Sequence, residues 1–309
     1  MTCLARGQSG EAPDGVRLVA ADRWIQGAYD GVTGQDWDVV IEVSWQPELV
    51  ETAVAALAAR ARHWVYVSSV SVYADHSLVG GDESAAISSP WEGSGEAGHE
   101  DYGGAKAACE TAFRVAVPVD QLVIVRPGLI AGYGDPSDRF GYWPGRVARA
   151  QPADVVLTPP MEIPLQVIDV LDLSGWLVDL GERRTAGVFD AVGEIVTFGQ
   201  LIGQCVTATG QSPTFVAADQ DWLLEQGVEP WAGPESLPLW LPVPEYAGMM
   251  IHQNDAAKIS GLSLRPLGDT ARSALAWERK AGLNRPRKAG LSAEREADLL
   301  RAHRDAATR

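Results

Sequence analysis

Short apolar runs rich in β-branched residues alternate with helix-like stretches through the first half of the chain, and this alternation constrains the fold more than any other feature. The strand candidates are residues 2–5, 17–21, 39–43, 63–69 and 121–126. The helix candidates are residues 49–61 and 105–117, and the second of them stops at Pro118, which cannot continue a helix. Such alternation is typical of a parallel sheet covered by helices. The pattern therefore predicts an α/β fold.

The sequence changes in character from about residue 128, where glycine and proline become frequent and tryptophans recur. The strand and helix candidates are more isolated here: residues 166–170, 172–183, 188–192, 269–281 and 292–307. Residues 219–250 are rich in tryptophan, proline and leucine, which indicates a packed irregular segment. We therefore predict a sheet domain over residues 1–165. Residues 166–309 are predicted to form mainly a smaller second region with terminal helices, which also returns strands to the sheet.

Composition limits the classes of function. The chain has 309 residues, of which 46% are hydrophobic and 21% charged, as in ordinary folded proteins. The formal net charge of -16 disfavours attraction to nucleic acid and to anionic membranes. No apolar run approaches the roughly 20 residues that span a bilayer, and the N-terminus has no signal-peptide pattern. We therefore expect a cytoplasmic protein with no membrane partner.

Metal binding is not expected from the sequence. The three cysteines, Cys3, Cys109 and Cys205, are too few and too scattered for a disulfide framework or a zinc site. The acidic loop over residues 75–101 contains His99 as an isolated histidine, and its spacing fits no compact set of metal ligands. The basic C-terminal segment, residues 279–309, has no aromatic stacking platform, so no nucleic-acid partner is expected.

One constellation of side chains points to chemistry. Tyr102 and Lys106 are four residues apart, so on a helix they share one face, one turn apart. A lysine ammonium there favours the phenolate and lowers the pKa of the tyrosine. The tyrosine can then donate or accept a proton at a carbinol or carbonyl oxygen while hydride moves. Ser69 follows a predicted strand, at the sheet edge where ligands of open α/β sheets bind, and can hydrogen-bond the same oxygen.

At these residues the sequence resembles the extended branch of the short-chain dehydrogenase/reductase superfamily, the NAD-dependent epimerase/dehydratase family. The segments VSSVSVY (67–73) and YGGAK (102–106) are similar to its serine and YxxxK motifs. The segments VRPGLIAGYGD (125–135) and QVIDVLDL (166–173) look like two further family segments. The resemblance extends to about residue 192. It implies a Rossmann-type doubly wound parallel sheet in which Ser69, Tyr102 and Lys106 are catalytic.

The resemblance also implies a nicotinamide cofactor and the residues that hold it. These implied cofactor-binding residues are Arg6, Asp22, Arg23, Ser44, Lys106, Pro127, Gly128 and Leu129. An arginine just after the second strand suits the 2′-phosphate of NADP, whereas an acidic residue would suit the ribose hydroxyl of NAD. We therefore predict NADP, with NAD as the alternative. Trp45 is bulky at a position where the family has small residues against the cofactor.

The glycine-rich turn GxxGxxG that the resemblance implies is missing from the first forty residues. The chain opens with MTCLARGQSG, which looks like the second strand of the family pattern and its turn. The resemblance therefore implies that about one βα unit, roughly 25–30 residues, is absent from the N-terminus. The first strand is central in the order 3-2-1-4-5-6, so we expect strands two and three to lose their neighbour and strand four to expose an edge. A misassigned start codon is favoured over a genuine truncation with weak cofactor binding.

These observations predict an NAD(P)-dependent oxidoreductase or epimerase that acts on a small alcohol, ketone or sugar-derived substrate. Arg139 and Tyr142, which follow the RP segment, are candidate substrate contacts. Residues 166–309 would supply most of the substrate-binding region. The partner is a small-molecule substrate, and a homodimer is left open. The alternative is a non-catalytic Rossmann-like sensor or RNA-associated protein that kept the catalytic residues but not the phosphate-binding turn.

Overall fold

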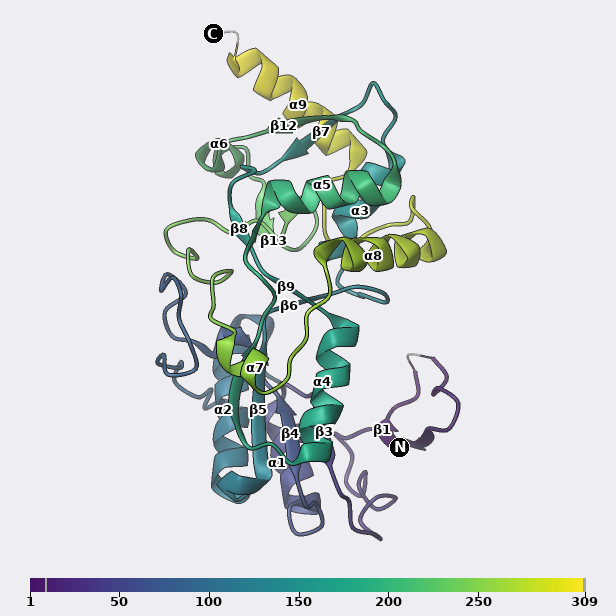
Figure 1. Cartoon of the computed structure of the whole chain (residues 1–309), viewed down its shortest axis with the longest axis vertical. Helices are drawn as coiled ribbons and strands as arrows, with labels where there is room; N and C mark the ends of the chain where they lie inside the picture. The colour runs from purple at the N-terminus through teal and green to yellow at the C-terminus, as the bar shows by residue number, and fades with distance from the viewer. Residues whose placement is uncertain (9, 308–309) are drawn as a thin grey trace. The chain divides into compact units, whose positions relative to one another are not determined.

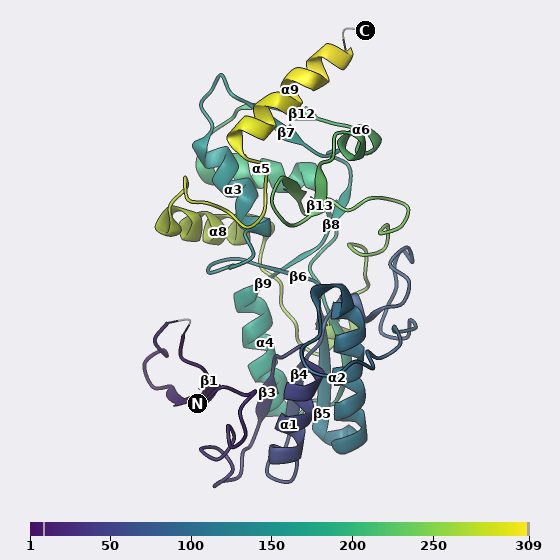
Figure 2. The same ribbon diagram turned by 180° about the vertical axis from the view of Figure 1, so that it is seen from behind.

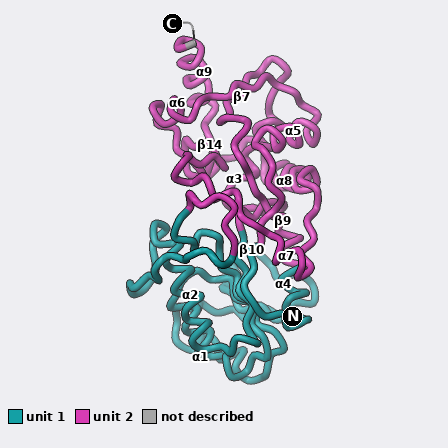
Figure 3. The backbone as a smooth tube through the Cα atoms, turned by 60° about the vertical axis from the view of Figure 1, so that its left-hand side comes forward, with its two compact units in different colours: residues 1–75, 83–127, 176–190 teal, residues 76–82, 128–175, 191–309 magenta. Residues whose placement is uncertain are grey.

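The computed structural model describes residues 1–8 and 10–307, and the chain divides into two compact units (Figure 3). Unit 1 contains residues 1–75, 83–127 and 176–190. Unit 2 contains residues 76–82 and 128–175, together with the chain from residue 191 onward. Neither unit is one continuous segment, because the chain passes between them several times. The predicted division at residue 165 lies inside unit 2.

Unit 1 is built on a sheet with the strand order β10-β5-β4-β3, of which Figure 1 labels β5, β4 and β3. The strands are β3 (Val40–Glu42), β4 (Trp64–Val67), β5 (Leu122–Pro127) and β10 (Gly187–Ala191). β3 pairs in parallel with β4, and β4 pairs in parallel with β5. Parallel neighbours need long crossover connections, which the intervening helices supply. Every residue of β4 and β5 is buried, which explains why β4 and the first four residues of β5 are apolar in the sequence.

Two helices pack on this sheet through a shared hydrophobic core. The helices α1 (Pro47–Leu57) and α2 (Tyr102–Ala116) lie side by side next to the strands (Figures 1 and 2). The rings of Trp64 and Tyr66 from β4 lie 5.2 Å and 4.7 Å from the ring of Phe113 on α2, measured between centroids. Single 3-10 turns flank these elements: η1 (Val70–Val72), η2 (His99–Asp101) and η3 (Val119–Gln121).

The outer edge of β3 has no strand partner among the described residues. β1 (Thr2–Ala5) and β2 (Arg17–Ala20) form a separate parallel pair. At this edge, Ile41 is 38% exposed and Val43 is 65% exposed. The sequence predicts this arrangement, in which the second and third strands of the family pattern lose their neighbour and the fourth exposes an edge.

Unit 2 consists of short strand pairs and helices around its own hydrophobic core. Its strands are β6 (Leu129–Ala131), β7 (Val155–Thr158), β8 (Pro164–Leu165), β9 (Val167–Asp169), β11 (Val196–Thr197), β12 (Thr214–Ala217), β13 (Glu229–Trp231) and β14 (Ser236–Pro238). Its helices are α3 (Arg139–Arg149), α5 (Phe198–Thr209), α6 (Gln220–Glu225), α7 (Asp255–Ile259), α8 (Leu267–Ala281) and α9 (Ala293–Ala307). α4 (Val170–Arg183) begins in unit 2 and ends in unit 1. No helix within the described ranges is both long enough and apolar enough to cross a membrane.

The sequence analysis predicts neither α3 nor α5. α3 contains Pro144 and Gly141, residues that normally argue against a helix interior. A Cβ on Gly141 would lie 2.3 Å from a carboxylate oxygen of Glu278, so a larger residue here would require the Glu278 side chain to move. α5 begins with a capping box between Thr197 and Gln200, which is a local signal that the sequence carries.

Candidate active site

The turn after β4 forms the first part of the site. Ser69 follows the strand and caps η1, because its Oγ accepts a hydrogen bond of 3.1 Å from the backbone N–H of Ser71. The first turn of α2 packs on this segment: a Cβ on Gly103 would lie 2.4 Å from the carbonyl oxygen of Ser71. A residue with a side chain could not approach so closely. The approach brings Tyr102, the first residue of α2, next to the turn that contains Ser69.

Lys106 lies one helical turn after Tyr102 and is 2% exposed. Its Nζ donates hydrogen bonds to the carbonyl oxygens of Val67 at 2.5 Å, Ser44 at 3.1 Å and Val43 at 3.5 Å. An ammonium has three N–H donors, so these carbonyls account for all of them. Burial lowers the pKa of Lys106 to about 8, although nearby anionic groups oppose the shift. The lysine therefore ties α2 to the C-terminal ends of β3 and β4.

Trp45, which follows β3, packs on the predicted catalytic tyrosine. Its ring lies 5.3 Å from the ring of Tyr102 between centroids, at an interplanar angle of 58°. The same indole stacks on the ring of His99 at 5.6 Å and 23°. His99 belongs to η2, the turn directly before α2. The half-buried Tyr102 ring is therefore in tilted contact with an indole. The sequence indicates only that Trp45 is bulky, and not which ring it contacts.

A buried network of charged and hydroxyl groups joins α2 to β4 and β5, and the sequence analysis does not predict it. Glu110 lies one turn after Lys106 on α2. It accepts hydrogen bonds from Nε and Nη2 of Arg126 at 2.9 and 2.8 Å. Ser68 Oγ donates to the same carboxylate at 2.7 Å. Arg126 Nη1 also donates to the hydroxyl of Tyr73 at 3.1 Å. The network thus fixes α2 to the strand ends beside the predicted catalytic residues.

Tyr73 extends this network to β10. Its hydroxyl donates to the fully buried carboxylate of Asp190, a residue 117 positions away, and lies 2.7 and 2.9 Å from its two oxygens.

Burial alone would raise the pKa of Glu110, but hydrogen bonds and charge from Arg126 outweigh it and lower the pKa. Burial likewise disfavours the Arg126 cation, and Glu110 more than compensates, so the pKa of Arg126 is raised. Both partners are therefore ionised at neutral pH. The local signal is that Glu110 follows Lys106 by four residues on one helix.

The residues predicted to hold the adenosine end of a cofactor have varied surroundings. Arg6 is exposed after β1, and Asp22 accepts a hydrogen bond from the backbone N–H two residues later. Arg23 forms a salt bridge of 2.7 Å with Glu42, and its guanidinium also donates to the carbonyl of Leu49 at 2.8 Å. Arg23 thus holds the loop after β2 against the end of β3 and the start of α1. Its engagement there explains its position without a cofactor.

The RP segment passes from unit 1 into unit 2. Pro127 ends β5 in unit 1, whereas Gly128 and Leu129 belong to unit 2. The backbone N–H of Gly128 donates to the carbonyl of Ala191 at 3.2 Å. Leu129 begins β6 and is 4% exposed. The role of these residues beside a nicotinamide ring stays a prediction.

The two predicted substrate contacts on α3 have different surroundings. The guanidinium of Arg139 lies 4.7 Å from the centroid of the Trp231 ring. Tyr142 is 0% exposed, and a Cβ on Gly290 would lie 2.1 Å from its ring. The ring of Tyr142 is thus enclosed in the core of unit 2, and its role as a substrate contact stays a prediction. The aromatic residues after the RP segment fill the core of unit 2.

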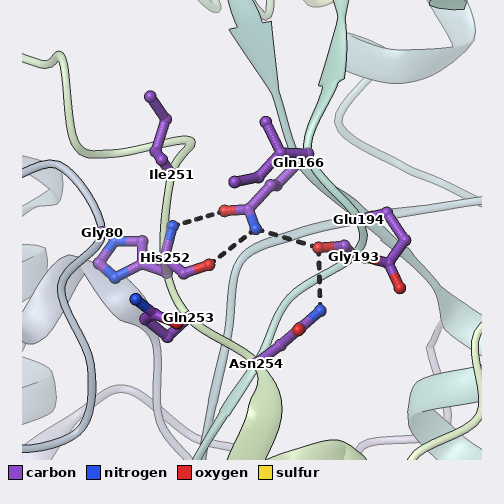
Figure 4. A pocket seen from close by; sticks show the side chains of 9 residues that line it. Gly80, Gln166, Gly193, Glu194, Ile251, His252, Gln253 and Asn254 are labelled. Atoms are coloured by element: carbon purple, nitrogen blue, oxygen red, sulfur yellow. Dashed lines mark hydrogen bonds between the residues drawn. The ribbon is translucent and has the colours of Figure 1, made fainter.

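Unit 2 contains a pocket of about 400 Å³ that the sequence does not predict (Figure 4). The side-chain amide of Gln166 accepts from the N–H of His252 at 2.8 Å and donates to its carbonyl at 2.9 Å. Gln166 and Asn254 both donate to the carbonyl of Gly193, at 3.0 and 3.2 Å. Burial lowers the pKa of His252 to about 4, and nearby His76 contributes in the same direction. The two amides therefore cross-link the loops that shape the pocket, and His252 is neutral at neutral pH.

No protein-family model matches the chain, and no curated protein matches it. Solved structures do match it. A provisionally assigned epimerase from Burkholderia cenocepacia J2315 has a TM-score of 0.64 at 18% identity, covering 89% of both chains. UDP-glucuronic acid 4-epimerase from Bacillus cereus in complex with NAD has a TM-score of 0.59 at 15% identity, covering 89% of this chain and 84% of its own. RMD from Pseudomonas aeruginosa complexed with NADPH has a TM-score of 0.58 at 15% identity, covering 90% of this chain and 99% of its own.

These likenesses confirm the predicted fold class. The chain has the Rossmann-type α/β fold of these structures, with parallel strands and a second unit. The resemblance that the sequence motifs carry is therefore confirmed at the level of the fold.

Within the described residues, no group of three or more His, Cys, Asp or Glu side chains is placed to hold a metal ion.

Proposed function

We propose that this protein is a nicotinamide-dependent oxidoreductase or epimerase that acts on a small alcohol, ketone or sugar-derived substrate. The observation that carries the proposal is the placement of Tyr102 and Lys106 in the first turns of α2, with Ser69 in the adjoining turn. A phenol, an ammonium and a hydroxyl thus lie at the C-terminal ends of parallel strands, where ligands of open α/β sheets bind. The fold shared with epimerases, one of them solved with NAD, supports the proposal.

Each of the three residues has a proposed task. Tyr102 gives a proton to a carbonyl oxygen during reduction, or removes one from a carbinol during oxidation. Lys106 favours the phenolate through its positive charge. Ser69 donates a hydrogen bond to the same substrate oxygen, for which its hydroxyl turns from Ser71 Oγ, 3.2 Å away. A bound nicotinamide would supply the hydride acceptor or donor.

The residues fit the nicotinamide half of a dinucleotide better than its pyrophosphate. Lys106 can exchange its longest contact, the 3.5 Å hydrogen bond to the Val43 carbonyl, for a ribose hydroxyl. A pyrophosphate, in contrast, needs backbone N–H groups at a glycine-rich helix start, and the first forty residues contain no GxxGxxG. We therefore assign no pyrophosphate contact among these residues. Arg6 is the proposed contact for the 2′-phosphate of NADP, with NAD as the alternative.

Two measurements test this proposal. Titration with NADPH and with NADH, followed by tryptophan fluorescence, tests cofactor binding. Turnover of a panel of alcohols, ketones and sugar nucleotides, followed by nicotinamide absorbance, tests the chemistry. We expect Tyr102→Phe to abolish turnover and to leave dinucleotide binding nearly unchanged, because only the hydroxyl is removed. Tyr133→Phe, at a residue 43% exposed, is the matched control and should keep full turnover. Retained turnover in Tyr102→Phe would remove Tyr102 from its proposed role.

A non-catalytic Rossmann-like sensor or RNA-associated protein is the second candidate. Two observations favour it: the donors of Lys106 are all used on backbone carbonyls, and an indole packs against the Tyr102 ring. The net charge of -16 disfavours RNA as the partner. Absence of any fluorescence response to both dinucleotides would favour this candidate. Under either candidate we propose a cytoplasmic protein, and a homodimer stays a prediction.

A further inference from the structure

We infer that Trp45 is a specificity-determining residue that controls access to the phenol of Tyr102. The inference rests on the proposed function, in which Tyr102 must meet the reacting molecule. It concerns a residue for which that function assigns no task. The direct observation is the contact of the Trp45 indole with the Tyr102 ring, at 5.3 Å between centroids.

The backbone on both sides of Trp45 is anchored, so its ring is held at this place. On one side, the carbonyl of Ser44 accepts hydrogen bonds from Lys106 Nζ at 3.1 Å and from the Tyr66 hydroxyl at 3.2 Å. On the other side, the side chain of Gln46 is buried and pairs with the backbone of Ala97: it accepts from the N–H at 2.8 Å and donates to the carbonyl at 3.2 Å.

The Gln46–Ala97 pair also sets the position of the tyrosine. Ala97 lies shortly before η2 and α2, so the pair holds the entry to α2 against the end of β3. The ring of His99, in η2, stacks on the Trp45 indole, with 5.6 Å between the ring centroids. The segment that carries the indole, after β3, and the segment that leads into α2 are thus each held by hydrogen bonds. These bonds keep the indole in contact with Tyr102.

A molecule that approaches the covered side of Tyr102 has to displace the indole. Aromatic contacts of this kind contribute enough to lower the affinity of a competing ligand by about two- to tenfold. Trp45 therefore acts as a selective barrier: it weakens dinucleotide binding and restricts the size of the molecule that reaches the phenol. Removing the indole should expose Tyr102 and strengthen dinucleotide binding by that factor.

Nitration with tetranitromethane, resolved by peptide mass spectrometry, measures access to each tyrosine directly. We expect Trp45→Ala to raise the nitration rate of Tyr102 at least about threefold. Trp24→Ala removes a tryptophan that is 41% exposed, and it is the matched control. Exposed Tyr133 should react in every variant and buried Tyr142 in none, which reports on folding. Trp45→Phe, which retains a smaller ring, should fall between wild type and Trp45→Ala.

The outcomes separate this inference from the proposed function. Equal nitration of Tyr102 in Trp45→Ala and Trp24→Ala would overturn the inference, whatever the protein binds. Faster nitration together with tighter NADPH binding, measured by fluorescence titration, supports it in full. If the wild type binds NADPH and Trp45→Ala binds it no more tightly, the indole is not a barrier and the inference fails. If no variant responds to NADPH or NADH, the proposed function fails, and the nitration rates still report whether Trp45 covers Tyr102.

Discussion

Replacing Glu110 by glutamine removes the charge from one partner of a buried ion pair. The carboxylate is completely buried and the Arg126 side chain is 3% exposed. The substitution leaves a guanidinium in the core opposite a neutral amide, which accepts only through one atom. Breaking a buried pair from one side costs about 3–5 kcal/mol, because the remaining charge is desolvated without compensation. We expect Glu110→Gln to lower the free energy of unfolding by that amount.

Urea unfolding, followed by tryptophan fluorescence and by circular dichroism, measures this loss. Arg114→Gln is the matched control: Arg114 contacts the same carboxylate at 3.4 Å, but its side chain is 47% exposed. Its removal should cost less than about 1 kcal/mol. In the double variant Glu110→Gln/Arg126→Met neither member of the Glu110–Arg126 pair is charged, so its loss should be smaller than the sum of the two single losses.

The pH dependence provides an independent check. The pKa of Glu110 is lowered in the folded state from its ordinary value of 4.5. The stabilisation is therefore fully present above pH 4.5 and is lost as the pH falls through the folded pKa. Glu110→Gln should lack this part of the acid transition. If Glu110→Gln costs no more than Arg114→Gln, the buried pair does not stabilise the fold as argued.

Two further predictions concern His252 in unit 2 and a pair of glycines, Gly103 in unit 1 and Gly203 in unit 2. The pKa of His252 falls from 6.5 to about 4 on folding, so the folded state binds fewer protons and stability falls as the pH drops below 6.5. We expect the free energy of unfolding to fall by about 2 kcal/mol between pH 7 and pH 5. Urea unfolding at both pH values measures this loss, which should be smaller in His252→Gln. Gly103→Ala should displace the start of α2 and destabilise the protein, because its Cβ would lie 2.4 Å from the Ser71 carbonyl oxygen. Gly203→Ala, on α5 with open space around it, should instead stabilise by up to about 1 kcal/mol, and equal melting temperatures for the two variants would contradict the packing argument.

The sequence by itself determined the strands, the helices of the sheet unit and the spacing of the catalytic candidates. β4 and β5 follow from short runs that are wholly or mostly apolar, and α2 follows from a helical pattern that ends before Pro118. The four-residue spacing puts Tyr102 and Lys106 one turn apart wherever the helix lies. These features depend on residues close together in the chain, so local propensity and hydrophobic periodicity are sufficient to predict them.

Only the tertiary structure decided what those side chains contact. Lys106 uses its donors on carbonyls from two strands, and Tyr73 reaches Asp190 across 117 positions. Trp45 covers Tyr102 because two separate hydrogen-bonded segments bring the rings together. Tyr142 has the polar tip of a binding residue, yet it fills the core of unit 2. Contacts between distant segments depend on how whole elements pack, and no local pattern in the sequence records that packing.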